Sequence, residues 1–322
     1  MNNEELISLI LKCKENQNLY GSSCENLLEL VKCEEIPAWI LESLWELFKN
    51  EDWEELNNRF YTNLAFGTGG MRGRTIGNYV TKAEKGTAKE KETPNYAAVG
   101  SNTLNEITVL RATKALFLHV KKWLAEEGIL AQPRLVIAHD VRHFSRKFCE
   151  LSASAWSKLG GYALVFDGPR STPQLSFTVR HRYAHAGVVI TASHNPFHDN
   201  GFKAYFADGA QLVPPHAEEV VERYEKISIQ DLLPLLVAET NEESWNILPT
   251  EDDLAYRAAL EDAVLDPDIL KDNAPKLVFT PIHGTGSISA IPALWDHGVE
   301  VAVVDEQNKF DPNFSSVHSP NP

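Results

Sequence analysis

A serine and a lysine on either side of two predicted turns could together carry nucleophilic or phosphoryl-transfer chemistry. Residues 187–190 (Gly-Val-Val-Ile) predict a buried strand that opens into a polar turn, which would hold Ser193 at the rim of a sheet. Asn195-Pro196 fixes that turn, because proline forces its predecessor into an extended conformation, and Asn200-Gly201 predicts a second turn. We therefore expect Ser193 and Lys203 at neighbouring loop and strand positions.

The same serine has a simpler interpretation, in which Ser193 caps a turn and Lys203 is a solvated surface charge. A bare Ser-His-Asn tripeptide would favour that interpretation, because such tripeptides are common by chance. A serine hydrolase is disfavoured, since no Gly-x-Ser-x-Gly elbow surrounds Ser193. The full string from Thr191 to Lys203 favours a serine that carries a phosphoryl group with cationic support.

Two further segments carry arginines that suit anion binding. Phe66–Arg74 is rich in glycine, so its backbone amides can approach an anion and Arg72 can add a fork of donors. This segment lacks the Lys-Ser or Lys-Thr ending of a P-loop. Asp140–Arg146 follows a predicted strand, and there Arg142 and Arg146 either help to hold a phosphate or are surface charges at the start of a helix.

Histidines also lie in the predicted loops. His283 is followed by glycines at a strand end and could take a proton or touch a phosphate. It could equally cap the following helix, and we favour a structural role. His194 and His198 are interpreted as groups that shape the serine loop.

Alternating strands and helices must position these loops. Residues 134–140, 162–166 and 187–190 predict strands, separated by helices over 144–159 and 172–183. This alternation is typical of an α/β domain with a mainly parallel sheet, in which ligands bind beyond the carboxyl ends of the strands.

Helical and acidic segments flank this region. Residues 1 to about 60 predict helices, whose tryptophans favour packing over a ligand cage. Residues 230–272 are acidic and turn-rich, and we place a domain boundary there. Beyond it, residues 276–304 predict one further strand, helix, strand unit.

Composition limits the class of protein. The 322 residues are 43% hydrophobic and 23% charged, which is ordinary for a soluble protein of two domains. A net charge of -15 and the lack of a basic stripe argue against a nucleic-acid partner. The four cysteines show no zinc spacing and predict free thiols in a reducing cytoplasm. The N-terminus predicts neither a signal peptide nor a membrane span, so we expect a cytoplasmic protein without a membrane partner.

The string from Thr191 to Pro196, followed by Asn200-Gly-Phe-Lys203, resembles the phosphoserine loop of the α-D-phosphohexomutase superfamily, which includes phosphoglucomutases and phosphomannomutases. Phe66–Arg72 and Asp140–Arg146 are similar to two other segments of this family, and His283–Gly286 resembles the loop that begins its second domain. Phe66–Arg72 and His283–Gly286 look more like the phosphoglucomutase and phosphopentomutase branch than like bacterial phosphomannomutase.

The resemblance implies a domain order. A helical N-terminal extension (1–60) precedes domain I (61–212), an α/β domain with a mixed, mainly parallel sheet sandwiched by helices. An incomplete second α/β domain of the same type (213–322) follows. The third and fourth domains of the family, which recognise the sugar and its phosphate, are expected to be absent from this chain.

The resemblance also implies roles for particular residues. Ser193 would carry the phosphoryl group, Lys203 would assist proton transfer, and Arg72 would lie beside the phosphoserine. The candidates for binding phosphate or substrate are Arg142, Arg146, His194, Asn195 and His283.

A Mg²⁺ ion is the cofactor that the family implies. It would be held by the phosphate on Ser193 and by three aspartates of an Asp-x-Asp-x-Asp-Arg loop, which is absent from this chain. Asp266-Pro-Asp268 lacks the third aspartate and the arginine, and we interpret it as a turn.

The expected function of the full-length parent is therefore interconversion of glucose 1-phosphate and glucose 6-phosphate through a phosphoserine and a bisphosphate, with glucose 1,6-bisphosphate as activator. Within the same class, a phosphopentomutase or a phosphomannomutase is the alternative. From another class, the alternative is a phosphate-binding fragment that is catalytically inactive. The missing aspartate loop favours that alternative for this chain alone, for which we expect no turnover. The oligomeric state is left open.

Overall fold

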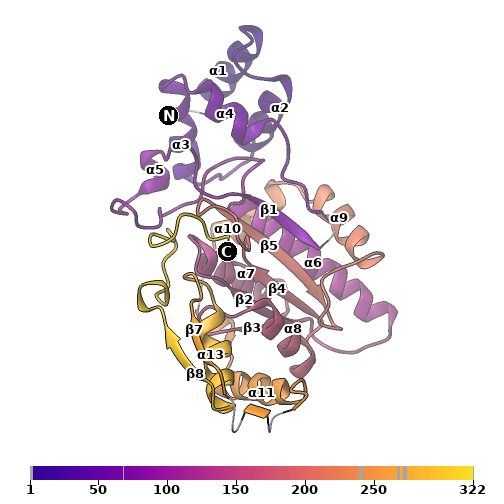
Figure 1. Cartoon of the computed structure of the whole chain (residues 1–322). Helices are drawn as coiled ribbons and strands as arrows, with labels where there is room; N and C mark the ends of the chain where they lie inside the picture. Colours follow the sequence, from indigo (N-terminus) through magenta and orange to yellow (C-terminus); the bar gives the residue numbers. More distant parts are fainter. Residues whose placement is uncertain (1–2, 68, 239–241, 267–268, 271–273, 322) are drawn as a thin grey trace. The chain divides into compact units, whose positions relative to one another are not determined.

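The computed structural model describes residues 3–321, except 68, 239–241, 267–268 and 271–273 (Figure 1). Its residues form two compact units. Unit 1 consists of Met1–Leu130, His198–Phe202 and Leu212–Asn241. Unit 2 consists of Ala131–Phe197, Lys203–Gln211 and Glu242–Pro322. These units follow contacts between residues, and the domain boundaries implied by the family remain a prediction.

Unit 1 begins with the helices predicted for residues 1–60. They are α1 (Asn3–Glu15), α2 (Gly21–Val31), α3 (Ala38–Lys49) and α4 (Trp53–Phe60). Each buries an apolar stripe, such as Leu6 and Ile10 of α1. Trp39 stacks on Tyr96 with ring centroids 4.0 Å apart, so this tryptophan packs as predicted.

The rest of unit 1 is built around a long helix. The remaining elements are β1 (Gly70–Arg74), α5 (Lys82–Lys85), α6 (Glu106–Glu126), α9 (His216–Lys226), the 3₁₀ turn η1 (Gln230–Leu232) and α10 (Leu233–Leu236). Asn105 caps the start of helix α6, because its side-chain oxygen accepts from the backbone N–H groups of Ile107 and Thr108. Helix α9 packs along it.

Unit 2 contains the parallel sheet that the alternation predicted. Its strands are β2 (Arg134–His139), β3 (Tyr162–Val165), β4 (Ala186–Ile190) and β6 (Asn246–Ile247). Strand β5 (Asp199–Phe206) begins in unit 1, where β1 is its neighbour. The second half of β5 belongs to unit 2, where the strand order is β5-β4-β2-β3-β6. Strand β2 pairs in parallel with β4 and with β3.

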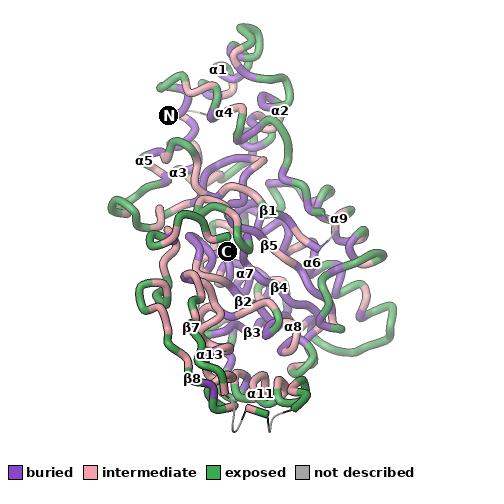
Figure 2. Tube along the Cα trace, in the orientation of Figure 1, coloured by how far each residue is buried: buried purple, intermediate pink, exposed green. Residues whose placement is uncertain are grey.

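Helices flank this sheet, which confirms the predicted fold class. Helices α7 (Ser145–Lys158) and α8 (Thr172–His181) both pack on β2 and β4, which are buried almost throughout (Figure 2). Because both faces of these strands are covered, they read as continuous apolar runs in the sequence. One core cluster consists of Val136, Ala138, Leu164, Phe166, Leu175, Val179, Ala184, Val189, Tyr205 and Leu248.

The acidic segment after residue 230 contains more regular structure than the sequence predicted. Strand β6 pairs in parallel with β3, and it is followed by α11 (Thr250–Glu261). The segment also contains the short 3₁₀ turn η2 (Glu242–Ser244). Interpreting residues 230–272 as turn-rich was therefore incomplete, because packing against α8 stabilises a helix whose own apolar stripe is weak.

The last predicted unit of strand, helix and strand is confirmed. Strands β7 (Lys276–Phe279) and β8 (Glu300–Val303) pair in parallel, with α13 (Gly286–Asp296) between them in the chain and the 3₁₀ turn η3 (Asp305–Gln307) after them. All four cysteines are buried free thiols. Within the described residues, no helix is both long enough and apolar enough to cross a membrane.

Candidate active site

Ser193 lies on an exposed loop just beyond the carboxyl end of β4. Its backbone has a left-handed conformation (φ 58°), which is uncommon for a residue other than glycine. The Ser193 N–H donates to Oγ1 of Thr191 at 2.9 Å, and that hydroxyl donates to Oδ2 of Asp140 at 2.6 Å. This chain of hydrogen bonds holds the turn, so the serine side chain is presented to solvent at the edge of the sheet.

Arg142 holds the serine loop, residues 191–197, through the backbone of the loop. Its guanidinium donates to the backbone carbonyls of Ser193 at 2.9 Å, Asn195 at 2.6 Å and Pro196 at 2.7 Å. The Arg142 side chain has no exposed surface. Three charge-assisted hydrogen bonds from one rigid fork fix the path of the loop on either side of His194.

Asp140 organises both the arginine and the serine turn. Its Oδ2 faces Nε of Arg142 at 3.2 Å, and its Oδ1 accepts from Oγ of Ser145 at 2.6 Å and from the Arg142 N–H at 2.9 Å. Asp140 follows the end of β2 in the chain, and β2 is the neighbour of β4. The carboxyl ends of two parallel strands thus bring Asp140, Arg142 and Ser193 together.

The two arginines predicted to hold a phosphate both have protein partners. The observed contacts of Arg142 fix the loop, so the structure gives it a positioning role. Arg146 pairs with Glu150 at 2.6 Å and donates to the carbonyl of Phe166 at 2.9 Å, which ties the start of α7 to the end of β3. Direct phosphate binding by either arginine stays a prediction.

The neighbours of Ser193 in the loop differ in exposure. His194 is exposed, and its Nδ1 lies 3.4 Å from Oγ of Ser193. Asn195 is half-buried, and its backbone N–H donates to the Ala192 carbonyl at 3.1 Å. His194 is therefore placed to meet a group carried by the serine, whereas the observed backbone contacts of Asn195 shape the turn.

His283 is buried in a second loop of unit 2. Its Nδ1 lies 2.8 Å from the carbonyl oxygen of Lys309, and its Nε2 lies 2.6 Å from Oγ of Ser316. With both ring nitrogens in contact with protein groups, the histidine fits the structural role that we favoured. Its assignment to phosphate binding stays untested.

A segment near the end of the chain contacts this region and was missed by sequence reasoning. Residues 311–316, the C-terminal strap, include Phe314, whose ring centroid lies 5.1 Å from the guanidinium carbon of Arg142. Nε2 of His143 lies 3.1 Å from Oδ1 of Asn313 in the same strap. Burial lowers the pKa of His143, which favours its neutral form. No local pattern signals these contacts, because they join segments far apart in the sequence.

Lys203 and Arg72, the other predicted catalytic residues, lie on strands. Lys203 is half-buried in the part of β5 that belongs to unit 2. Because β5 is the neighbour of β4, Lys203 lies on the strand beside the one that leads to Ser193. Arg72 is exposed on β1 of unit 1, so the second half of the glycine-rich segment forms a strand. Its predicted proximity to the phosphoserine stays a prediction, and Thr68 of the same motif is outside the described residues.

A Mg²⁺ site does not fit the residues that the structure describes. Among them, no group of three or more His, Cys, Asp or Glu side chains could hold a metal ion. Both oxygens of Asp140, the acid in the hydrogen-bond network beneath Ser193, already contact Ser145, Thr191 and Arg142. Asp266 is described, whereas residues 267–268 of the Asp266–Asp268 segment are not.

Known proteins are similar to this chain in sequence. The family model for "Phosphoglucomutase/phosphomannomutase, alpha/beta/alpha domain I" matches residues 96–231. A phosphoglucomutase from Staphylococcus haemolyticus is 33% identical over 272 residues, which cover 82% of this chain and 43% of that protein. A phosphoribomutase from Saccharomyces cerevisiae is 26% identical over 313 residues, which cover 88% of this chain and 44% of that protein.

A solved structure is similar to this chain in fold. A protein from Thermus thermophilus, provisionally named a phosphomannomutase, superposes with a TM-score of 0.57 at 25% identity. The match covers 80% of this chain and 48% of that one, so the chain spans about half the length of the relatives it matches. By sequence and by fold, this chain is similar to phosphoglucomutases and phosphomannomutases, and its residues 96–231 match domain I of that family.

Proposed function

We propose that this chain is the phosphoserine-bearing part of a phosphosugar mutase of the phosphoglucomutase type. The observation that carries the proposal is the geometry of Ser193, which is exposed at the end of β4 on a loop that Arg142 holds by three carbonyls. A phosphoryl carrier must be accessible to substrate and fixed in position. The relatives named phosphoglucomutase and phosphoribomutase support a sugar phosphate as substrate.

The proposed reaction has two balanced transfers. In the first, a hydroxyl oxygen of the sugar monophosphate attacks the phosphorus on Ser193. The bond from phosphorus to Oγ breaks, and a sugar bisphosphate forms. The bisphosphate then reverses its orientation relative to Ser193. Oγ attacks the other phosphate and regains a phosphoryl group, which releases the isomeric monophosphate. Positioning and electrostatic stabilisation supply most of the acceleration in such transfers.

The side chains proposed to assist are Lys203, Arg72 and His194. In the first transfer Lys203 would take the proton of the attacking sugar hydroxyl and give it to Oγ of Ser193, which leaves; in the second it would take the proton of the attacking Ser193 hydroxyl and give it to the sugar oxygen that leaves. Arg72 would stabilise the roughly -1.5 to -2 charge of the phosphoserine. His194, 3.4 Å from the serine oxygen, would donate to a phosphate oxygen. A Mg²⁺ ion would require ligands that the described residues do not supply.

The alternative function is a phosphate-binding unit that is phosphorylated on Ser193 but does not isomerise sugars. The lack of an acidic metal cluster among the described residues favours this alternative for the chain by itself. The two functions make the same prediction for phosphorylation and opposite predictions for turnover.

One experiment tests the proposal in two stages. The purified chain is incubated with glucose 1,6-bisphosphate, and phosphopeptides are located by mass spectrometry, with Ser193→Ala as the control. We expect phosphate on Ser193 and none on the variant, and an unlabelled Ser193 would refute the carrier role. Movement of the phosphate from one position to another is then assayed separately for glucose, ribose and mannose monophosphates. Turnover of one of them assigns the mutase and its sugar, whereas labelling without turnover assigns the alternative.

A further inference from the structure

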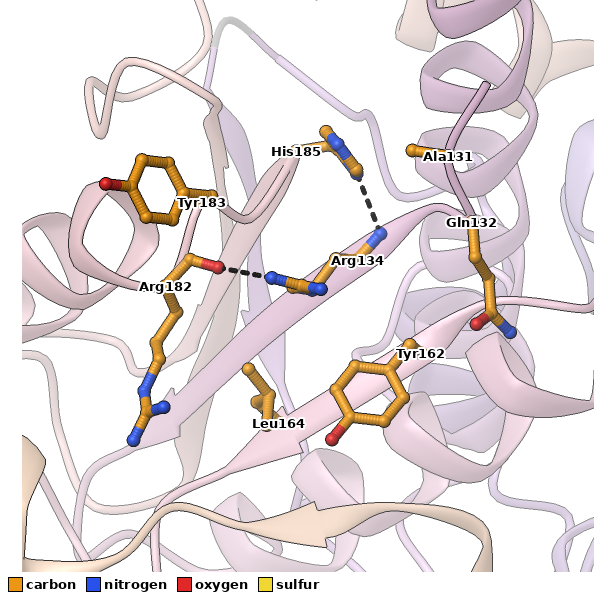
Figure 3. A pocket seen from close by; sticks show the side chains of 8 residues that line it. All are labelled: Ala131, Gln132, Arg134, Tyr162, Leu164, Arg182, Tyr183 and His185. Carbon is orange, nitrogen blue, oxygen red and sulfur yellow. Dashed lines mark hydrogen bonds between the residues drawn. The ribbon is translucent and has the colours of Figure 1, made fainter. Parts of the chain in front are cut away.

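A hollow lies at the end of the unit 2 sheet opposite the serine loop. Its volume is about 630 Å³, within the range of roughly 300–1,000 Å³ found for small-molecule sites. It is lined by Ala131, Gln132, Arg134, Tyr162, Leu164, Arg182, Tyr183 and His185 (Figure 3). These residues lie at the amino ends of β2, β3 and β4. A strand advances about 3.3 Å per residue, so the length of β2 separates the hollow from Asp140 and the serine loop.

Arg134 supplies the charge of the hollow. Its Nη1 donates to the backbone carbonyl of Arg182 at 2.7 Å, which fixes the orientation of the guanidinium (Figure 3). Across the described chain, Arg134 forms no ion pair with a carboxylate. Arg134 is half-buried in a protein of net charge -15 and still has no carboxylate partner. Its guanidinium is therefore suited to bind an anionic ligand.

The other two basic residues that line the hollow, Arg182 and His185, add no net positive charge. Arg182 forms a two-pronged ion pair with Asp252, whose carboxylate is buried. His185 accepts the backbone N–H of Arg134 at 3.0 Å through Nδ1, so its neutral form carries the proton on Nε2. Burial and the nearby charge of Arg134 lower the pKa of His185. One net positive charge therefore remains in the hollow, on Arg134.

Aromatic and apolar groups surround this charge. Leu164 belongs to the core cluster under α8 and gives the hollow an apolar lining. The Tyr162 ring centroid lies 5.7 Å from the guanidinium carbon of Arg134. Tyr183 is 83% exposed and has a left-handed backbone conformation (φ 50°), so a large ring stands in solvent on a constrained turn. Exposed rings beside a fixed cation suit a ligand that has both a flat body and a negative charge.

We propose that this hollow is a binding site for a small ring-bearing anion, with a phosphate or carboxylate group on Arg134 and the ring against Tyr162 and Leu164. The site is independent of the serine loop and of the proposed mutase chemistry. Its affinity decreases with salt, because it rests on one charge-assisted contact and a modest apolar area.

Titration calorimetry on the full chain tests this site with defined probes. Phenyl phosphate is the main probe, inorganic phosphate lacks the ring, benzoate replaces phosphate by carboxylate, and phenol lacks the charge. We expect phenyl phosphate to bind at least several-fold more tightly than inorganic phosphate or phenol. The comparison with benzoate decides which anion the arginine prefers.

Two arginine variants complete the test. Arg134→Gln should weaken phenyl phosphate binding about tenfold or more, whereas Arg180→Gln, an exposed arginine of the neighbouring α8, should leave it unchanged. Tyr162→Leu should weaken phenyl phosphate but not inorganic phosphate, and circular dichroism checks that each variant is folded. Equal binding by Arg134→Gln and Arg180→Gln, or no saturable binding by the unaltered chain at millimolar concentration, would overturn the proposal.

Discussion

The guanidinium of Arg142 lies over the ring of Phe314, with its central carbon 5.1 Å from the ring centroid, while the same guanidinium donates to the carbonyl of Ser193 at 2.9 Å. Phe314 is 6% exposed. The C-terminal strap therefore covers the arginine that holds the serine loop. This relationship links a residue with no chemistry of its own to the position of the candidate phosphoryl carrier.

Replacing Arg142 by lysine should disturb the serine loop more than the loss of a surface charge would. A lysine ammonium is a point charge and cannot reach three carbonyls in the arrangement of the guanidinium fork. Leaving three loop carbonyls and Asp140 poorly paired should lower the free energy of unfolding by about 2–4 kcal/mol. We also expect phosphorylation of Ser193 by glucose 1,6-bisphosphate to slow at least tenfold.

Urea unfolding and the time course of phosphopeptide formation measure these two effects. Arg180→Lys, on the exposed surface of α8, is the matched control and should change neither. If Arg142→Lys labels Ser193 as fast as the control does, Arg142 has no positioning role.

Phe314→Leu should loosen the serine loop through Arg142. The variant loses a cation–π contact of about 0.5–1 kcal/mol and part of a buried ring. We expect a lower melting temperature and a several-fold slower phosphorylation of Ser193. The variant Phe314→Tyr, which keeps the ring, should retain much of the rate.

Phe310→Leu is the control, because Phe310 precedes the strap and is 51% exposed. It should behave like the unaltered chain in both measurements. Identical labelling rates for Phe314→Leu and Phe310→Leu would show that the strap has no influence on the serine.

Arg59 of α4 should be among the most sensitive positions in unit 1. It is 2% exposed and pairs with Glu55 at 2.8 Å and with Glu84 at 2.5 Å. Arg59→Met leaves two buried carboxylates without their cation, which should lower the free energy of unfolding by about 3–5 kcal/mol.

The matched control is Lys226→Met, which removes an ion pair at the same helical spacing, with Glu222, from an exposed face of α9. Thermal unfolding followed by circular dichroism should show no change for that variant. A loss of similar size in the two variants would contradict the importance of burial.

His119 should make the stability of unit 1 depend on pH. Burial lowers its pKa to about 4, and His216 and the cations Lys122 and Arg223 oppose its protonation, although Glu219 favours it. Below an unfolded pKa of about 6.5 the unfolded chain binds a proton that the folded chain does not bind. Stability from this group is therefore complete above that pH and falls as the pH decreases toward 4, by on the order of 3 kcal/mol.

Urea unfolding at several pH values between 7 and 4.5 measures this effect. Because other groups titrate in the same range, the test is the difference between the unaltered chain and His119→Gln. We expect a shallower decline for the variant. Parallel declines would mean that His119 has the same pKa in both states.

Much of the candidate active site around Ser193 could be predicted from the sequence, because its backbone conformation depends on neighbouring residues in the chain. A β-branched run before Thr191 specifies a buried strand, and Asn195-Pro196 specifies the turn after it. An exposed Ser193 at that edge follows from these two features. Alternating apolar periods likewise determined the order of strands and helices from β2 to β5, since each period is a property of one segment.

Only the tertiary structure decided what the charged residues do. The sequence left two interpretations open for Arg142 and gave none for Arg59. Both are buried, because partners distant in the chain supply the carbonyls and carboxylates that pair with them. The contacts of Phe314 and the edge strand β6 also depend on distant segments, and so does the hollow around Arg134. A local pattern specifies conformation and amphipathicity, whereas the partner of a polar group is determined by which segments the fold brings together.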